Sequence, residues 1–337
     1  MTSSALVAVV LALVLGTASV VALSRSAVRL PQATPSERTL HAGAVPRAGG
    51  YAIWAGFLPV ALWLPPPFPG GVGGWLPAFA AVLVVSGIDD ARPVRAGVRL
   101  VVHLAAAAWC AWSLWRGADA AAEVTPLAVA SVVVLTLAIA WSANLYNFMD
   151  GSDGLAATMA LLGFAAYGIA ASRVGGAASA AFFALAAATL PFLAVNRPRA
   201  TMFLGDVGSV PLGFLAAAFG AAGAMTGLWP AWFPVLVFLP FIADATLTLA
   251  RRAARGARLG DAHREHYYQR LHRMGAGHAG TLGAYAAAMT VSGAAALLCL
   301  AFAPAWGSAV LLLACVVCFT LFRAIDYHWH RRLPTPR

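Results

Sequence analysis

Long apolar stretches separated by short polar segments recur along the whole chain. A transmembrane helix needs about 17–25 mostly apolar residues, and eleven stretches come close to that length. Several contain glycine or proline, so their ends are predicted only to within a few residues. The pattern predicts an all-α polytopic membrane protein with about eleven transmembrane helices. The predicted spans are residues 4–23, 49–64, 72–88, 98–115, 126–143, 155–171, 177–195, 207–226, 228–250, 281–303 and 304–322.

The polar segments between these spans are short, and no internal repeat is visible. Residues 1–337 are therefore expected to form a single integral membrane domain. The composition agrees, because 61% of the residues are hydrophobic and only 10% are charged, against about 25% charged residues in an average soluble domain. The four cysteines lie inside apolar runs without metal-type spacing to histidine, and are interpreted as apolar helix residues.

The positive charges predict the orientation of the chain in the membrane. The basic residues are all arginine, and they concentrate in alternate loops. The positive-inside rule then places the N-terminus outside and the C-terminus in the cytoplasm. The net charge of +10 is expected to face anionic lipid headgroups and phosphorylated substrates rather than nucleic acid. The predicted cytoplasmic segments are residues 24–48, 87–99, 144–154, 196–207 and 251–280.

Five aspartates fall at the predicted cytoplasmic ends of helices. Acidic side chains close to a membrane are costly and mark functional sites. Carboxylates that converge on one face of a helical bundle therefore predict a polar site that can hold a metal ion. The five are Asp89, Asp90, Asp150, Asp153 and Asp206.

The segment of residues 144–154 carries the densest set of polar side chains. Asn144 and Asn147 are three residues apart, which places them on one face of a helix end. Asp150 and Asp153 follow in a glycine-containing turn, where the backbone can approach a ligand closely. A polar loop that caps its helices would explain one or two of these residues. Four of them between two apolar helices favour a binding site.

Two further segments carry carboxylates suited to phosphate chemistry. Adjacent carboxylates such as Asp89 and Asp90 repel each other unless a cation or a proton lies between them. Asp206 comes just before a predicted helix, where free backbone N–H groups can bind a phosphate. Helix capping remains the alternative for both segments. Arg99 begins the next helix, and either clamps a phosphate or extends to the membrane surface.

Histidines interrupt the long arginine-rich segment of residues 251–280. The i, i+3 spacing of His263 and His266 would suit half of a zinc site, but no cysteine accompanies them. Binding of an anion by these histidines and Arg270 is therefore favoured. A purely positive-inside anchor would explain the arginines but not the neighbouring histidine, tyrosine and glutamine. In the first cytoplasmic segment, His41 and Arg47 are expected to lie near a lipid phosphate.

In this order, the segments resemble the polyprenyl-phosphate N-acetylhexosamine-1-phosphate transferase family, within glycosyl transferase family 4. The resemblance implies transfer of a sugar-1-phosphate from a UDP-sugar to undecaprenyl phosphate, with release of UMP. It also implies a bacterial inner-membrane protein whose active site faces the cytoplasm and begins surface-polysaccharide synthesis. The matching motifs are P-R-x-G-G at 46–50, D-D at 89–90, N-x-x-N-x-x-D-G-x-D-G at 144–154, G-D-x-G-S at 205–209 and the histidine-containing basic segment.

The resemblance implies a role for each motif residue. Asp206 would be the principal Mg²⁺ ligand, with Asn147 as a second ligand and Mn²⁺ as a substitute for Mg²⁺. Asp89 and Asp90 would be catalytic together with Asp206 and would serve the acceptor phosphate, and Arg99 would bind the lipid phosphate. The other residues expected to bind substrate are Arg47, Asn144, Asp150, Asp153, His263, His266 and Arg270.

Other functions remain as alternatives. The pattern H-x-x-H-Y-Y-Q-R-L at 263–271 departs from the three consecutive histidines of the phospho-MurNAc-pentapeptide translocase, so the resemblance favours the subgroup that starts O-antigen or related polymers. The translocase is the alternative within the family. A transporter would place ionisable residues in mid-span, and a non-catalytic flippase or assembly partner would not need the full aspartate set. The oligomeric state stays open, a homodimer included.

Overall fold

The computed structural model describes residues 3–26, 31–33, 45–258, 260 and 263–332. His41 and parts of the first and last predicted cytoplasmic segments lie outside these residues. The described part is helical almost throughout and has one antiparallel pair of two-residue strands, β1 (Gln32–Ala33) and β2 (Val45–Pro46). The predicted all-α class is confirmed.

Nine helical segments of the described chain are long and apolar enough to cross a membrane. Seven are single helices, and the last two are the stretches Tyr267–Phe302 and Pro304–Arg331. The former contains α11 (Tyr267–Leu271), the π-helical turn η1 (His272–Ala276) and α12 (Gly277–Phe302); the latter contains the turn η2 (Pro304–Trp306) and most of α13 (Gly307–Arg332). The seven single helices are α1 (Ser3–Arg25), α3 (Gly71–Ala91), α4 (Ala96–Ala118), α5 (Pro126–Phe148), α6 (Leu155–Ser172), α7 (Gly176–Asn196) and α8 (Asp206–Met225).

Two of the eleven predicted spans do not form long helices. The predicted span 49–64 is α2 (Gly49–Trp63), whose 15 residues rise only about 22 Å at 1.5 Å per residue. The predicted span 228–250 is divided at Phe238 into α9 (Trp232–Val237) and α10 (Leu239–Ala254). Apolar composition predicted both segments, but helix length and breaks depend on local backbone geometry that composition does not report.

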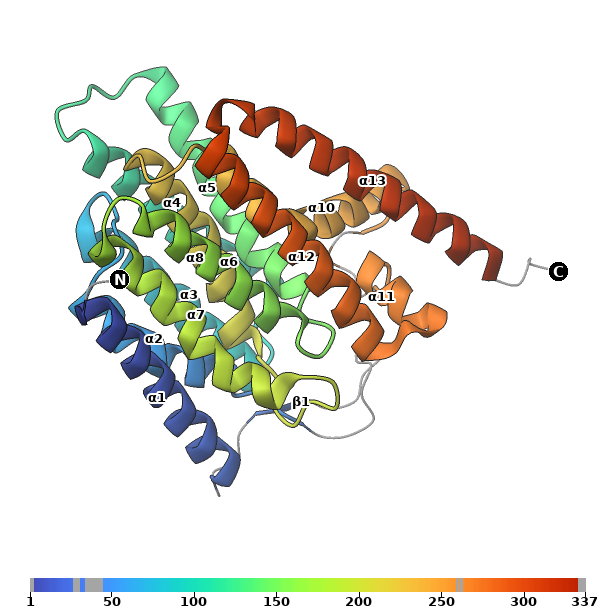
Figure 1. Cartoon of the computed structure of the whole chain (residues 1–337). Coiled ribbons are helices and arrows are strands. Elements are labelled where there is room, and N and C mark those ends of the chain that lie inside the picture. Colours follow the sequence, from blue (N-terminus) through green and yellow to red (C-terminus); the bar gives the residue numbers. More distant parts are fainter. Residues whose placement is uncertain (1–2, 27–30, 34–44, 259, 261–262, 333–337) are drawn as a thin grey trace.

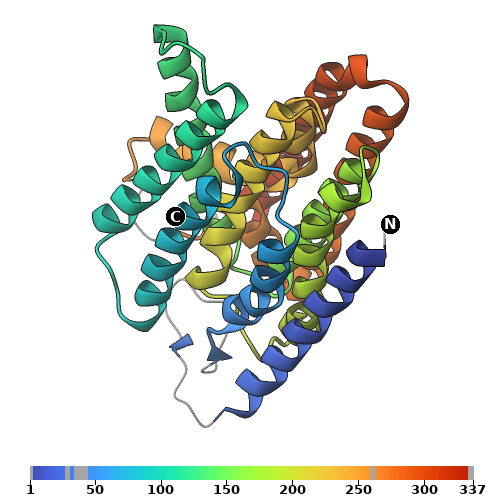
Figure 2. The same cartoon turned by 90° about the vertical axis from the view of Figure 1, so that its left-hand side faces the viewer.

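Helix α8 occupies the centre of the bundle and is the most completely buried of the long helices in the described chain. It packs against α3 and α5, and more lightly against α2, α4 and α6. Helices α1, α2 and α7 lie together on one side of it, while α12 and α13 form the opposite side (Figures 1 and 2). Large apolar side chains on the outer faces of α4, α5 and α13 remain exposed, as expected of surfaces that meet lipid.

Glycines let α8 approach its neighbours closely. A Cβ at Gly50 of α2 would lie 2.5 Å from the Cα of Gly208, and a Cβ at Gly213 would lie 2.3 Å from the carbonyl oxygen of Ser142 on α5. The Ser142 hydroxyl donates to the Gly213 carbonyl over 2.7 Å. Small residues at helix crossings permit such backbone contacts in membrane bundles. These contacts hold the first turn of α8 against α2 and its middle against α5.

Candidate active site

A cavity of about 550 Å³ lies where the ends of α3 and α5 meet the beginnings of α4 and α8. Residues from the segment before α11 close one side of it. The cavity brings together polar side chains from segments far apart in the chain, from Arg47 to Gln269. Ten of the twelve residues predicted from the sequence line it: Arg47, Asp89, Arg99, Asn144, Asn147, Asp150, Asp153, Asp206, His263 and His266.

Asp90 is one of the two predicted residues that do not line the cavity. Its buried carboxylate accepts hydrogen bonds from the backbone N–H groups of Asp206, over 3.1 Å, and Val207, over 2.8 Å. The first turn of α8 was expected to offer these groups to a phosphate, but Asp90 satisfies them. A guanidinium nitrogen of Arg47 lies 3.7 Å from the same carboxylate. Asp90 therefore fixes the start of α8 against the end of α3.

The backbone holds Arg47 in place beside α8. The Phe203 N–H donates to the Pro46 carbonyl over 2.8 Å, and the Gly49 N–H donates back to the Phe203 carbonyl over 2.9 Å. This pairing joins the segment before α2 to the segment before α8. Arg47 thus reaches the cavity from a chain region remote in sequence from the aspartates.

Arg99 connects two of the predicted catalytic carboxylates. Its Nη1 forms a short ion pair with Asp89 and lies 3.2 Å from Oδ2 of Asp206. Asp89 also accepts a hydrogen bond from the Val94 N–H over 2.7 Å. Adjacent residues Asp89 and Asp90 therefore have different environments: Asp89 faces the cavity, and Asp90 faces the start of α8.

The two asparagines at the end of α5 are both at the cavity. Asn147 donates from Nδ2 to Oδ2 of Asp206 over 3.4 Å, and its Oδ1 accepts from the Ser209 hydroxyl over 2.8 Å. Asn144 donates to the Ala140 carbonyl over 2.7 Å, four residues earlier in the helix. Asn147 is thus tied to α8, and Asn144 stays with its own helix.

The turn after α5 places its two aspartates differently. Burial raises the pKa of Asp150 well above its usual range, and the charges of Asp206 and Asp90 add to this effect. Asp153 accepts from the backbone N–H groups of Arg199 and Ala200 over 3.1 and 3.2 Å. Asp153 therefore holds the connection between α7 and α8, whereas Asp150 lines the cavity and its surroundings favour the protonated acid.

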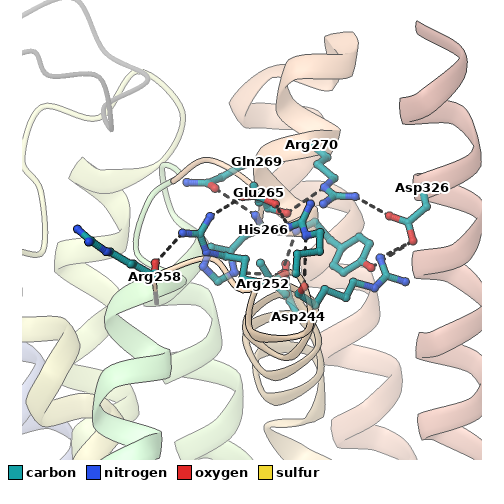
Figure 3. Close-up of polar contacts among 12 residues, drawn as sticks. Asp244, Arg252, Arg258, Glu265, His266, Gln269, Arg270 and Asp326 are labelled. Carbon is teal, nitrogen blue, oxygen red and sulfur yellow. Dashed lines mark hydrogen bonds and ion pairs between the residues drawn. The ribbon is translucent and has the colours of Figure 1, made fainter. Parts of the chain in front are cut away.

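A buried carboxylate positions the histidine-containing segment (Figure 3). Asp244 of α10 accepts from the N–H groups of Tyr267 and Tyr268 over 2.9 and 3.0 Å, and lies 3.3 Å from Nδ1 of His266. The Tyr285 hydroxyl donates to the same carboxylate through a short hydrogen bond. Asp244 thereby binds the start of α11, and His263 and His266 stack with ring centroids 5.0 Å apart beside the cavity.

Arg270 is the second predicted residue outside the cavity lining. Its guanidinium contacts Asp326 of α13 over 2.5 Å and donates to the Glu265 carbonyl over 2.9 Å. Figure 3 shows it directed toward α13. Glu265 in turn contacts Arg252, over 2.5 Å, and Arg255. The structure therefore gives Arg270 a position in an ion-pair network that connects the segment to α10 and α13.

Several residues at the site had no role in the sequence analysis. Asp244 lies inside an apolar span, and its isolated acidic side chain there was the signal that could have revealed it. The others are common residue types within apolar helices or loops, and only their position in space distinguishes them. The additional residues that line the cavity include Ser86, His103, Asn196, Tyr268 and Gln269.

The charges of the site suit a divalent cation and phosphates. Among the described residues that line the cavity, four carboxylates (Asp89, Asp150, Asp153 and Asp206) accompany two guanidinium groups, those of Arg47 and Arg99, so two negative charges remain when all are ionised. No three described His, Cys, Asp or Glu side chains group closely enough to hold a metal by themselves. That arrangement fits Mg²⁺, which commonly takes one or two carboxylates and completes its shell with water and substrate phosphates.

The fold and the site together indicate a multi-pass membrane protein with a cavity at one end of its helices that is lined by carboxylates and guanidinium groups. Comparison with known sequences agrees: the sequence model of glycosyl transferase family 4 matches residues 72–224. Over this region, which holds most of the residues that line the cavity, the chain is similar to glycosyl transferase family 4.

Known proteins with similar sequences belong to the same kind of enzyme by name. The decaprenyl-phosphate N-acetylglucosaminephosphotransferase of Mycobacterium tuberculosis is 29% identical over 283 residues, 73% of this chain and 70% of its own. The probable undecaprenyl-phosphate N-acetylglucosaminyl 1-phosphate transferase of Bacillus subtilis is 27% identical over 72% of this chain and 70% of its own. A phospho-N-acetylmuramoyl-pentapeptide-transferase of Synechocystis is 29% identical over only 42% of this chain and 40% of its own.

Proposed function

We propose that this membrane protein transfers an N-acetylhexosamine-1-phosphate from a UDP-sugar to a polyprenyl phosphate and releases UMP. The observation that carries the proposal is the cavity itself. It gathers Asp89, Asp206, Arg47 and Arg99 from helix ends that only the folded bundle brings together. Both substrates are phosphates, and the named relatives act on polyprenyl phosphates.

The proposed reaction is a direct displacement. The second pKa of a phosphate monoester is near 6, so the acceptor is largely a dianion at neutral pH. One of its oxygens attacks the phosphorus that bears the sugar, the bond from that phosphorus to the UMP oxygen breaks, and UMP leaves with the electron pair. The nucleophile needs little general-base assistance, and Asp89 either orients it or accepts a residual proton. Arg99 and Arg47 reduce the repulsion between the two phosphates.

A bound Mg²⁺ would neutralise charge on the donor diphosphate and on the departing UMP. Asp206 is the best-placed ligand, because its carboxylate lies at the cavity and is shared by Arg99 and Asn147. Asn147 turns its amide nitrogen toward Asp206 and keeps its oxygen on Ser209. Asn147 would therefore serve as a ligand only after its amide group reorients.

The proposal includes the predicted orientation. The UDP-sugar is water-soluble and the lipid cannot leave the bilayer, so a site at the inner leaflet of a bacterial plasma membrane serves both. The same arginine distribution that predicts a cytoplasmic position for the cavity also predicts an external N-terminus. Eleven membrane passages, a homodimer and a role in O-antigen or related surface-polysaccharide synthesis stay predictions.

The test uses protein purified in detergent with undecaprenyl phosphate, Mg²⁺ and a panel of UDP-sugars, and it measures UMP release. The panel includes UDP-GlcNAc, its 6-deoxy relatives and UDP-MurNAc-pentapeptide. We expect release with one N-acetylhexosamine donor, loss of release on addition of EDTA, and loss in Asp206→Asn. Asp119→Asn is the matched control, because Asp119 lies in an exposed loop between α4 and α5.

The other outcomes separate the alternatives. Release only with UDP-MurNAc-pentapeptide would indicate the translocase reaction. No release from any donor, in protein shown to be folded, would favour a transporter or a non-catalytic partner. Label from the donor's sugar-bearing phosphate that stays on the protein would indicate a covalent intermediate instead of direct displacement.

A further inference from the structure

A layer of uncharged polar side chains lies deeper in the cavity than the charged residues. The layer consists of Ser86, His103 and Asn144. Each of them lies three or four residues from a charged or amide residue on the same face of the same helix. At 1.5 Å per residue, the deeper residues are about 4.5–6 Å nearer to the middle of their helices. The pairs, deeper residue first, are Ser86 and Asp89 on α3, His103 and Arg99 on α4, and Asn144 and Asn147 on α5.

Two of these deeper residues, Ser86 and His103, are buried side chains of the cavity wall. His103 is 4% exposed and Ser86 is 2% exposed, and both line the cavity. The hydroxyl of Ser86 and both ring nitrogens of His103 lack a hydrogen bond of normal geometry to another described residue. The Asn144 amide nevertheless lies beside the His103 imidazole.

The absence of a bond at Ser86 is unusual for its position. Hydroxyls inside helices commonly bond to the carbonyl four residues earlier, as Thr136 and Thr189 do here over 2.8 Å. Buried polar groups are normally paired, and each unpaired one calls for a reason. These unpaired groups belong to two side chains that line one cavity, so a ligand that enters the cavity could supply their hydrogen bonds.

The donor groups of the layer suit an anionic ligand. It contains hydroxyl, imidazole and amide donors but no carboxylate, so it favours an anion more than the charged layer above it does. Leu100 borders the same cavity and is 49% exposed on α4, a helix whose neighbouring outer residue Val101 is also exposed. An anionic group at the end of an apolar chain matches this combination of donors and apolar access.

Resting on the proposed function, we propose that Ser86, His103 and Asn144 bind the phosphate of the polyprenyl phosphate acceptor. His103 donates from one ring nitrogen to a phosphate oxygen, and Ser86 donates from its hydroxyl. Arg99, one turn above His103, contacts the same phosphate from the charged layer. The acceptor is thereby held on the α3–α4 side of the cavity, and the donor diphosphate occupies the side of Asp206.

The test compares His103→Met, His103→Gln and Ser86→Ala with the unchanged protein. In His103→Met we expect the KM for undecaprenyl phosphate to rise 10- to 100-fold, about 1.4–2.8 kcal/mol, with the KM for the UDP-sugar changed less than twofold. His103→Gln keeps a donor and restores part of the loss. Ser131→Ala on α5 is the matched control for Ser86→Ala, because Ser131 is exposed and bonds to its own helix.

Stability separates ligand binding from a structural role. His103 makes no hydrogen bond of normal geometry within the described fold, so His103→Met should unfold at the same temperature as the unchanged protein or higher. A lower unfolding temperature with both KM values raised would indicate a structural residue and overturn the inference. A raised KM for the UDP-sugar alone would place His103 with the donor and would equally overturn it.

Direct binding distinguishes this inference from the proposed function. Native mass spectrometry with undecaprenyl phosphate alone requires no turnover. If no UDP-sugar supports transfer, the proposed function fails, yet lipid bound by the unchanged protein and lost in His103→Met would still support this site. Equal lipid binding by both proteins would overturn it.

Discussion

Replacing Asp244 by asparagine tests whether one buried carboxylate positions the histidine-containing segment. Asp244 accepts from two consecutive backbone N–H groups at the start of α11 and from the Tyr285 hydroxyl. An asparagine keeps one oxygen acceptor but places an NH₂ group against the remaining donors. At least one N–H, from Tyr267 or Tyr268, then loses its acceptor.

The expected magnitude follows from these contacts. A buried donor left without a partner costs about 1–3 kcal/mol, and the other bonds lose their charge assistance, so the start of α11 should be destabilised by about 2–4 kcal/mol. At 1.4 kcal/mol per factor of ten, local opening should become about 30- to 1,000-fold more frequent. The carboxylates at the ends of α3 and α8 should keep their arrangement, because they make no contact with Asp244.

Hydrogen exchange measured by mass spectrometry on the detergent-solubilised protein is the assay. Peptides that cover residues 263–271 should exchange faster in Asp244→Asn, while peptides from the first turns of α8 should be unchanged. Transferase activity should also fall in Asp244→Asn, since His263, His266 and Tyr268 line the cavity. Asp119→Asn provides the same chemical change at an exposed site. Unchanged exchange at 263–271 in Asp244→Asn would refute the reasoning.

Three further predictions test the packing and the charges of the bundle. Asp90→Ala removes the acceptor for two N–H groups of α8, so it should lower the free energy of unfolding by about 3–5 kcal/mol. The measurement is the thermal unfolding midpoint, which should fall. An unchanged midpoint would show that water replaces the carboxylate. Gly50→Ala introduces a Cβ 2.5 Å from the Cα of Gly208 and should lower the free energy of unfolding by about 1–3 kcal/mol. A Cβ at Gly283 would meet nothing within 4 Å, so Gly283→Ala should be neutral or stabilising. Equal effects of the two substitutions would contradict the close α2–α8 contact. Burial raises the pKa of Glu265, but hydrogen bonds from two arginines lower it more, to a net value below its ordinary range. Its stabilisation is therefore present above the unfolded-state pKa and is lost as the pH falls through the folded-state value. The unfolding midpoints of Glu265→Gln and the unchanged protein should differ at pH 7 and converge as the pH falls below the folded-state pKa of Glu265, and a constant difference would exclude this ion pairing.

Much of the site could be predicted from the sequence, because polar and charged residues are rare among the apolar residues of membrane-spanning helices. Asp89, Asp150 and Asp206 stand out since acidic residues are few and each falls at the end of an apolar run. Asn144 and Asn147 stand out in the same way. The cavity contains all five, and the helical class followed from the apolar runs themselves.

The class of fold, most of the helices and the set of polar residues at their ends follow from the order of apolar and polar residues alone. The tertiary structure decided which neighbour each residue faces. Consecutive residues of a helix point about 100° apart, so Asp89 reaches the cavity while Asp90 binds the start of α8. The position of Arg270 on its helix likewise brings its guanidinium to Asp326 and not to the cavity lining. His103 lies in an apolar run, and no neighbouring motif marks it as a site residue. Only the packing of α3, α4 and α5 around one cavity brings it beside the other polar residues.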